Sequence, residues 1–222
     1  ASWTQLGPHP WVWSVAINSD DHIYAGTFDG GIFRSVDNGM TWSQRNAGLT
    51  NPDAWAFAFK GNGSLFAGTR GGGVFRSTDQ AETWNQSNAG LINSRILSLA
   101  VDASGQLFAG TGSEGVFADG VFRTTDNGAS WTKASIGLTS TRVKALAISS
   151  SGHIFAGTPA GVFLSTNNAN TWTEINTGLA RTYVQSLALN SSGHIFAGIW
   201  YGGVFRSTNN GLTWTESNLG LT

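Results

Sequence analysis

One sequence motif occurs five times in this chain, and its recurrence limits the possible folds more than any other feature. The copy at Ala67–Trp84 reads AGTRGGGVFRSTDQAETW, and similar copies begin at Ala25, Ala109, Ala156 and Ala197. Every copy ends at a tryptophan, and successive copies lie roughly 40–50 residues apart. A repeat of this period indicates a propeller or a solenoid, so we interpret the 222 residues as one continuous array of repeats.

Each repeat divides into four short runs of strand-forming residues. In the second repeat these are Ala54–Phe59, Leu65–Thr69, Gly73–Ser77 and Thr83–Asn88, separated by turns rich in Gly, Asn, Asp and Ser. Four antiparallel strands repeated radially form the blades of a β-propeller. We therefore predict an all-β fold, a five-bladed β-propeller of four-stranded antiparallel blades, as one domain over residues 1–222. The predicted repeats are approximately residues 8–48, 49–90, 91–137, 138–178 and 179–222, and residues 1–7 form an extra outer strand.

The first strand of each repeat carries large apolar residues on one face and small residues on the other. The large face holds Val15, Phe57, Leu99, Leu146 and Leu187, followed two residues later in each strand by another large apolar residue. Serine or alanine occupies the alternate positions. This pattern predicts wedge-shaped blades that pack large face against small face, with both faces of every blade buried.

A turn of the pattern S-x-D-x-G-x-T-W closes each repeat, and residues 35–42 hold a complete copy. Asp and Ser side chains accept hydrogen bonds from loop amides, Gly supplies a positive φ, and Trp packs beneath the hairpin. The turn resembles the Asp-box, or BNR, repeat of sialidases, sortilin-type receptors, xyloglucanases and photosystem II assembly factors. In those families the turn is structural and lies away from the ligand. The resemblance therefore implies structural roles for Asp37, Asp79, Asp126, Asn167, Asn209, Trp42, Trp84, Trp131, Trp172 and Trp214.

Composition excludes several classes of function. The formal net charge is −1 and 11% of residues are charged, so the chain has no electrostatic footprint for nucleic acid. It has no cysteine, which excludes disulfides and thiolate chemistry. No apolar run reaches the roughly 18–20 residues of a membrane helix, so we expect no membrane insertion. The opening Ala1-Ser2-Trp3 fits a processed or an excised segment, and we expect a secreted or bacterial cell-envelope protein.

Residues that change between repeats gather at one end of the predicted blades, opposite the recurrent turns. This end includes four tryptophans that the repeat does not require, together with tyrosine and cationic residues. Aromatic rings stack on the C–H faces of sugars while polar groups bind the hydroxyls. We therefore predict a lectin-like carbohydrate site. The predicted ligand-binding residues are Trp11, Trp13, Trp55, Arg95, Arg142, Tyr183, Trp200 and Tyr201.

Two features of this end have an alternative explanation. Trp13 and Trp55 suit a role as apolar plugs at the mouth of the central channel. The third repeat carries an insertion at Gly112–Gly120, which suits either a lip over the site or a surface hairpin with no role in binding.

An enzymatic function lacks its constellation of residues. A glycosidase needs two facing carboxylates, and the candidates at the variable end are Asp29, Asp53, Glu114 and Asp119. Nothing in the sequence places any two of them at the required separation, and the F-R-I-P segment of sialidases is absent. We therefore predict a non-enzyme without catalytic residues or cofactors.

Two recurrent residue types fit blade construction better than chemistry. Arginine recurs in the third strand, at Arg34, Arg76, Arg123 and Arg206, where we expect it to serve outer-blade packing. Histidine recurs at the start of the second strand, at His22, His153 and His194. Equivalent positions of different blades lie too far apart to share one metal ion, so we predict no metal site.

The sequence leaves three functions open. The first is carbohydrate binding, the second a protein-interaction or assembly module, as the resemblance to sortilins and photosystem assembly factors implies. The third is a repeat fragment or engineered array that binds no ligand. Because residues 1–7 duplicate a fourth strand that the last repeat also has, the terminal strands also suggest self-association.

Overall fold

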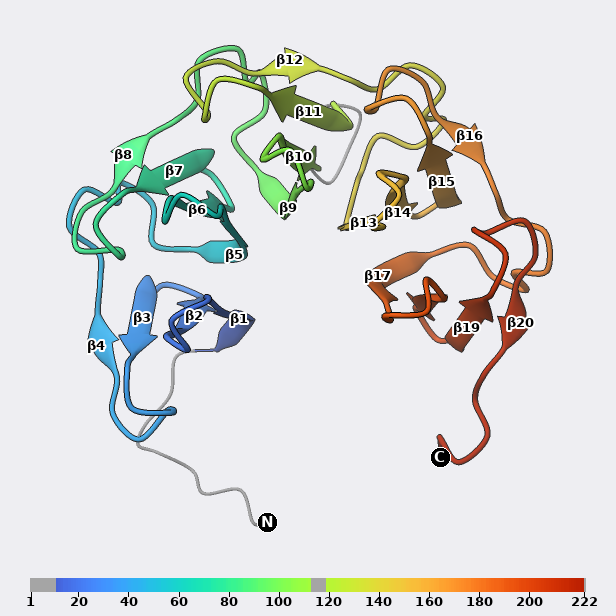
Figure 1. Cartoon of the computed structure of the whole chain (residues 1–222), viewed down its shortest axis with the longest axis horizontal. Helices are drawn as coiled ribbons and strands as arrows, with labels where there is room; N and C mark the ends of the chain where they lie inside the picture. The colour runs from blue at the N-terminus through green and yellow to red at the C-terminus, as the bar shows by residue number, and fades with distance from the viewer. Residues whose placement is uncertain (1–10, 113–118, 222) are drawn as a thin grey trace.

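Five four-stranded antiparallel sheets form an arc in the computed structural model, which describes residues 11–112 and 119–221 (Figure 1). The first two sheets contain β1 (Val12–Ile17), β2 (Ile23–Thr27), β3 (Ile32–Ser35), β4 (Ser43–Gln44), β5 (Ala54–Phe59), β6 (Leu65–Thr69), β7 (Val74–Ser77) and β8 (Asn85–Gln86). The third and fourth contain β9 (Ile96–Val101), β10 (Leu107–Thr111), β11 (Val121–Thr124), β12 (Thr132–Lys133), β13 (Ala145–Ile148), β14 (Ile154–Thr158), β15 (Gly161–Ser165) and β16 (Thr173–Glu174). The fifth contains β17 (Val184–Leu189), β18 (Ile195–Ile199), β19 (Gly203–Ser207) and β20 (Thr215–Glu216).

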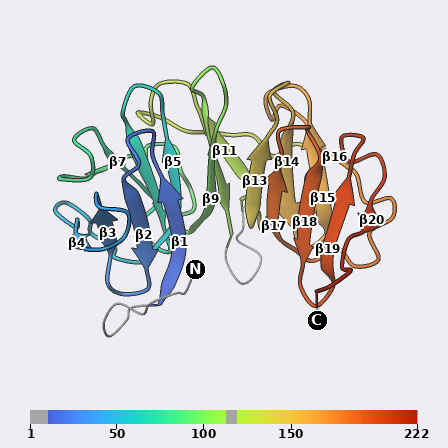
Figure 2. The same cartoon turned by 60° about the horizontal axis from the view of Figure 1, so that its bottom comes forward.

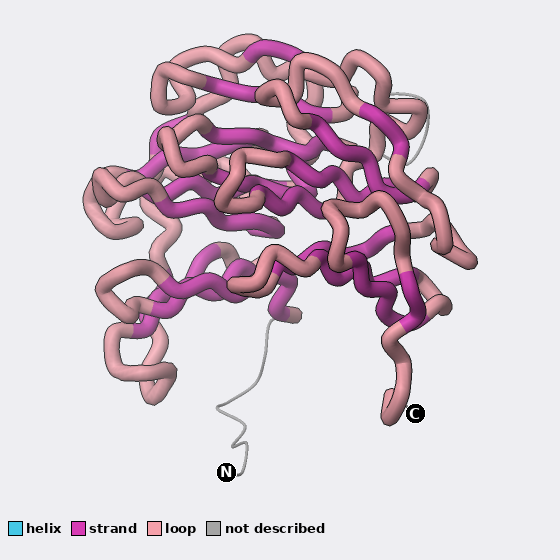
Figure 3. The backbone as a smooth tube through the Cα atoms, turned by 45° about the vertical axis from the view of Figure 1, so that its right-hand side comes forward, coloured by secondary structure: helices cyan, strands magenta, loops and turns pink. Residues whose placement is uncertain are grey.

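Each sheet is a blade whose strands follow one another in sequence order, from an inner strand to an outer one. We number the blades 1 to 5 along the chain. The inner strands β1, β5, β9, β13 and β17 face the middle of the arc, and the short outer strands lie on its rim (Figure 1). Side views show the blades standing next to one another with their loops at two opposite ends (Figures 2 and 3). The predicted all-β, five-bladed propeller architecture is confirmed.

The outer strands are shorter than the sequence predicts. The second repeat was expected to form a strand over Thr83–Asn88, but β8 contains only Asn85–Gln86. The backbone explains the difference, because the amide of Trp84 donates to the carbonyl of Ala47 in the preceding blade at 2.8 Å. Trp84 is therefore bonded across the blade boundary and cannot pair with its own third strand.

Neighbouring blades pack large face against small face, as the alternation predicts. Leu99 of blade 3 lies in one apolar cluster with Ala56, Ala58 and Phe66 of blade 2. Equivalent clusters join blade 1 to blade 2, blade 3 to blade 4, and blade 4 to blade 5. The apolar core is thus divided into four layers, one at each boundary between successive blades.

The prediction that both faces of every blade are buried is wrong at the two ends of the arc. Val15 and Ile17, on the large face of blade 1, are 63% and 58% exposed. Ser186 and Ala188, on the small face of blade 5, are also exposed. Blades 1 and 5 stand apart in Figure 1, so neither face is covered by another described blade. The predicted extra strand at residues 1–7 lies outside the described residues.

The recurrent turn is held by its own side chains. In the first copy, Ser35 Oγ accepts from the Gly39 amide at 2.8 Å, while Asp37 accepts from the Thr41 amide at 2.9 Å and from its hydroxyl at 2.5 Å. The glycine position has φ +85° at Gly39, and Ala81 adopts +69° there in the second copy. These contacts are consistent with the predicted structural role of the turn.

The same contacts lower the pKa of three carboxyl groups. Hydrogen bonds from the Thr41 side chain, then from its amide and from Ser35, lower the pKa of Asp37 to about 2. The pKa of Asp79 and that of Asp126 are also lowered to about 2, led by the hydroxyls of Thr83 and Ser130. Asn167 accepts from the amide of the equivalent threonine without any charge, and Asn209 does the same.

Candidate functional site

Irregular pairing near the start of the inner strand leaves one residue outside the ladder in blades 1, 2, 3 and 5. In blade 1 the pairing of β1 with β2 skips from Val12 to Ser14, which leaves Trp13 without a partner in the ladder. The same bulge leaves Trp55 unpaired in blade 2. β-Bulges are concentrated near binding sites because they redirect a side chain. The residues at this position are Trp13, Trp55, Leu97, Lys144 and Gln185.

These residues border a hollow of about 490 Å³ at the centre of the arc, which we call the axial hollow. Arg70 reaches it from the turn between β6 and β7, and Trp200 from the turn between β18 and β19. All five blades contribute to its wall. The lining residues are Trp13, Trp55, Arg70, Arg95, Leu97, Arg142, Lys144, Gln185 and Trp200.

Trp55 is the centre of one aromatic–cationic cluster on this wall. Its ring lies 5.3 Å from that of Trp13, centroid to centroid. The guanidinium carbons of Arg70 and Arg95 lie 5.3 and 5.1 Å from its centroid, within cation–π distance. Two guanidinium groups are therefore held against one ring, and their planar N–H donors remain near the hollow.

A second cluster forms on the opposite side, between blades 4 and 5. Lys144 Nζ lies 4.7 Å from the ring centroid of Tyr183 and donates to Gln185 Oε1 at 2.6 Å. Arg142 contacts the Tyr183 hydroxyl at 3.5 Å. The Tyr183 ring is in turn 6.3 Å from that of Trp200. These contacts fix the two cations relative to the aromatic wall.

The electrostatic character of the axial hollow is cationic. Four of its lining residues carry a positive charge, and no lining residue is acidic. Although the chain as a whole has a net charge of −1, the field inside this hollow favours anions. The nearby carboxylate of Asp53 faces a different partner, because its Oδ1 accepts from the amide of Asp29 at 2.8 Å.

Five of the eight residues predicted to bind a ligand line the axial hollow, namely Trp13, Trp55, Arg95, Arg142 and Trp200. The other three stand beside it in aromatic contacts. Trp11 packs against Phe28 at 6.1 Å, Tyr183 contacts the cations described above, and Tyr201 meets Trp200 edge-on at 5.1 Å. The prediction omitted Arg70, Leu97, Lys144 and Gln185, although the last three occupy the same repeat position as Trp13.

Among the described residues, two of the candidate glycosidase carboxylates, Asp29 and Asp53, lie in neighbouring blades and are joined by one hydrogen bond. Asp53 holds the turn that contains Asp29, and Asp119 lies 3.6 Å from the ammonium of Lys133. Glu114 lies outside the described residues, with most of the insertion at Gly112–Gly120. Among residues 11–112 and 119–221 no cluster of three or more acidic or histidine side chains is suited to a metal ion.

The sequence matches no protein-family model and no curated protein. Solved structures resemble the fold. An ancestral GH74 enzyme has a TM-score of 0.82 at 22% identity, over 100% of this chain and 33% of the enzyme. The GH74 xyloglucanase from Xanthomonas campestris gives 0.76 at 19%, over 96% of this chain and 38% of that protein. YCF48 bound to D1 peptide gives 0.69 at 16%, over 96% and 70%.

The chain therefore spans about one third of the length of the GH74 structures that it matches. No helix long and apolar enough to cross a membrane occurs in the part of the chain that the structure describes. These likenesses establish the fold, and the chain is a β-propeller array built from five blades.

Proposed function

We propose that this chain is a non-catalytic binding module that holds an acidic carbohydrate in the axial hollow. The observation that carries the proposal is the wall of the hollow, which combines three tryptophan rings with four cationic side chains and contains no acidic residue. Tryptophan rings suit the apolar faces of a sugar ring, and guanidinium forks suit a carboxylate or sulfate substituent. A neutral ligand would make no use of the four positive charges.

The arrangement of the two clusters supports these separate roles for the tryptophan rings and the cations. Trp13 of blade 1 and Trp200 of blade 5 are half exposed on the wall of the hollow. Arg70 and Arg95 are already stacked on Trp55, which reduces the conformational entropy that binding would cost. A saccharide that spans the hollow would meet a ring on each side and a cation between them.

A peptide is the second candidate ligand, because YCF48, a structural neighbour, was solved with a D1 peptide bound. A cationic hollow would accept an acidic segment or a chain-terminal carboxylate. Other neighbours include a bacterial surface component of a type-IX secretion system and the extracellular domain of a two-component system. We extend this location to the present chain as a secreted or cell-envelope protein.

The test is a glycan array that contains matched neutral, uronic-acid and sulfated oligosaccharides, followed by calorimetry on the strongest ligand. We expect saturable binding to acidic glycans that weakens as salt is raised, because ionic contacts are screened. Trp55→Ala and the double variant Arg70→Met, Lys144→Met should each reduce affinity at least about tenfold. Lys133→Met is the matched control, since this exposed cation lies outside the hollow and its loss should leave binding unchanged.

Two results would contradict the proposal. Binding to neutral glycans that equals binding to their acidic counterparts would remove the role of the cations. If no glycan binds, and an acidic peptide binds in a way that Trp55→Ala abolishes, then the ligand of the axial hollow is a protein segment.

A further inference from the structure

The boundaries between successive blades repeat one set of polar contacts. Trp84 of blade 2 donates its indole Nε1 to the carbonyl of Arg45, in blade 1, at 2.9 Å. Its backbone amide donates to the carbonyl of Ala47 at 2.8 Å. The equivalent tryptophans of blades 3, 4 and 5 make both bonds to their own preceding blades, with Nε1 to oxygen distances of 2.7–2.8 Å.

Glycines are placed to allow these contacts. A Cβ added to Gly48 would lie 2.0 Å from the carbonyl oxygen of Trp84, and equivalent glycines at the next three boundaries would clash in the same way. The second strand of each of blades 1 to 4 also has a glycine that receives the following blade, as Gly157 receives Val184, whose side chain would be 2.7 Å from an added Cβ. The interface is therefore specified by backbone shape as well as by apolar area.

Blade 1 presents one half of such an interface, and no other described blade covers it. Trp42 is 38% exposed, whereas its four equivalents are 3–4% exposed, and its indole has no acceptor among the described residues. Val12 is 54% exposed, whereas the equivalent residues of the other blades are fully buried. With Val15 and Ile17, these residues form an apolar surface free of charge, which we call the leading face.

Blade 5 presents the other half, which we call the trailing face and define by Ser186, Ala188, Gly198, Arg206 and Gly220. Gly220 is the counterpart of Gly48 and has φ +84°, yet an added Cβ there would meet nothing within 4 Å in the described chain. An added Cβ on Gly198, the counterpart of Gly157, would meet only atoms of its own blade. Glycines shaped for a neighbour are thus left open.

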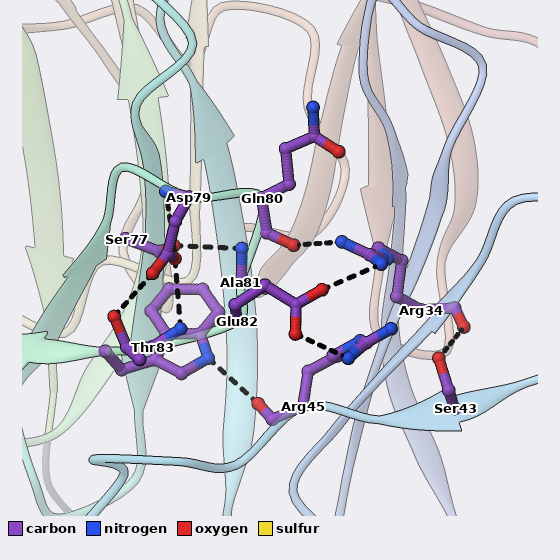
Figure 4. Close-up of polar contacts among 10 residues, drawn as sticks. Arg34, Ser43, Arg45, Ser77, Asp79, Gln80, Ala81, Glu82 and Thr83 are labelled. Atoms are coloured by element: carbon purple, nitrogen blue, oxygen red, sulfur yellow. Dashed lines mark hydrogen bonds and ion pairs between the residues drawn. The ribbon is translucent and has the colours of Figure 1, made fainter.

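The polar groups of the trailing face match acceptors on the leading face. At the boundary between blades 1 and 2, Arg34 donates to the carbonyl of Gln80, in the next blade's turn, at 2.6 Å (Figure 4). Arg206 is the counterpart of Arg34 and is exposed, and Asn38 is the counterpart of Gln80. Ser186 is likewise the counterpart of Ser98, which donates to a carbonyl of the following blade at 3.3 Å.

We propose that the leading face of one copy of this chain packs on the trailing face of a second copy and reproduces the inter-blade interface a fifth time. A second copy fits because it carries the complementary glycines, acceptors and small residues in the register that the four internal boundaries already use. In this contact Trp42 Nε1 donates to the carbonyl of Ser217, the counterpart of Arg45. Gly198 receives Val12, and Arg206 meets the carbonyl of Asn38.

The proposed contact is heterologous, so an open assembly has an unused leading face at one end and an unused trailing face at the other. Assemblies therefore grow head to tail until a ring closes or a filament forms. This mode differs from pairing of edge strands, because it buries faces of blades and leaves the outer strands β4 and β20 free. None of the residues that define the two faces lines the axial hollow, so self-association and ligand binding can be tested separately.

Sedimentation velocity over a wide range of protein concentration tests the proposal. We expect the unmodified chain to associate as concentration rises. Val15→Asp on the leading face and Ala188→Arg on the trailing face should each weaken association by at least about 100-fold, because each buries an unpaired charge. Ile92→Asp is the matched control, since this exposed isoleucine lies between β8 and β9, away from both faces, and association should persist.

Mixing the two blocked variants gives the decisive measurement. Val15→Asp keeps an intact trailing face and Ala188→Arg keeps an intact leading face, so the mixture should form a 1:1 dimer that grows no further. Gly220→Ala on the Val15→Asp partner should abolish this dimer, because its Cβ would meet the Trp42 carbonyl. A monomeric unmodified chain at all concentrations would overturn the proposal, as would a mixture that stays monomeric. Association that Val15→Asp blocks and Ala188→Arg does not would also overturn it.

Discussion

Trp84 Nε1 and the carbonyl oxygen of Arg45 lie 2.9 Å apart across the boundary between blades 1 and 2. The bond joins the recurrent turn of one blade to the residue that follows the outer strand of the blade before it. Since three other boundaries contain the same bond, each blade depends on its predecessor for the burial of its tryptophan. Stability in such an array is the sum of blade and boundary contributions.

The first prediction compares two tryptophans that occupy the same repeat position. In the monomeric Val15→Asp background, Trp84→Phe should lower the free energy of unfolding by about 1–3 kcal/mol, because it leaves the part-buried Arg45 carbonyl without a donor. Trp42→Phe should change it by less than about 0.5 kcal/mol, since Trp42 is exposed. Urea unfolding followed by circular dichroism measures both, and equal losses would show that the boundary bond contributes nothing.

The second prediction compares two glycines with the same backbone conformation. Gly178 and Gly220 have φ values of +93° and +84°, so alanine costs about 1–2 kcal/mol at either position through backbone strain alone. An added Cβ at Gly178 would also lie 2.2 Å from the Trp214 carbonyl, whereas Gly220 has open space. Gly178→Ala should therefore lower the melting temperature clearly more than Gly220→Ala. Calorimetry of the two variants in the Val15→Asp background decides the matter.

The third prediction concerns acid stability. The pKa of Asp37, Asp79 and Asp126 falls from 3.8 to about 2 on folding. Their stabilising contribution is therefore fully present above the unfolded pKa and is lost as the pH falls from about 4 towards 2. The triple Asp→Asn variant should lose less stability over this interval than the unmodified chain.

Blades 4 and 5 provide a natural precedent for this variant, because Asn167 and Asn209 hold the same turn contacts without a titrating group. Melting temperatures measured between pH 5 and pH 2 are the readout. If the unmodified chain and the triple variant lose stability equally between pH 5 and pH 2, groups other than these three carboxylates cause the acid sensitivity. Because these carboxylates lie at the surface, raised salt should reduce the difference.

The fold was accessible from the sequence because local signals agree with one another. The repeat period, the turns and the alternation of the inner strands all predict four-stranded blades, and the large face of Leu99 packs as expected. The open faces of blades 1 and 5 were not predicted. Val15 occupies the position in β1 that Leu99 occupies in β9. Only the arrangement of the blades shows that no other described blade covers Val15.

The candidate site was predictable in position but not in character. Comparison of repeats found Trp13 and Trp55, because a residue that changes among conserved neighbours within one chain stands out. Arg70 and Lys144 were not among the predicted binding residues, because their convergence on one hollow depends on bulges and turn geometry that the pattern does not encode. The cationic character follows from that convergence, since the whole chain carries a net charge of −1.

The last prediction tests this local charge without any ligand. Trp13 and Trp200 are exposed tryptophans on the wall of the cationic hollow, and a cationic surface concentrates iodide and repels caesium. Iodide should therefore quench the exposed tryptophan fluorescence more strongly than caesium, and the difference should shrink in Arg70→Met, Lys144→Met. Acrylamide, which is neutral, should quench both proteins equally and so control for accessibility. Equal quenching by iodide and caesium in the unmodified chain would show that counter-charges neutralise the hollow, and the acidic ligand would lose its physical basis.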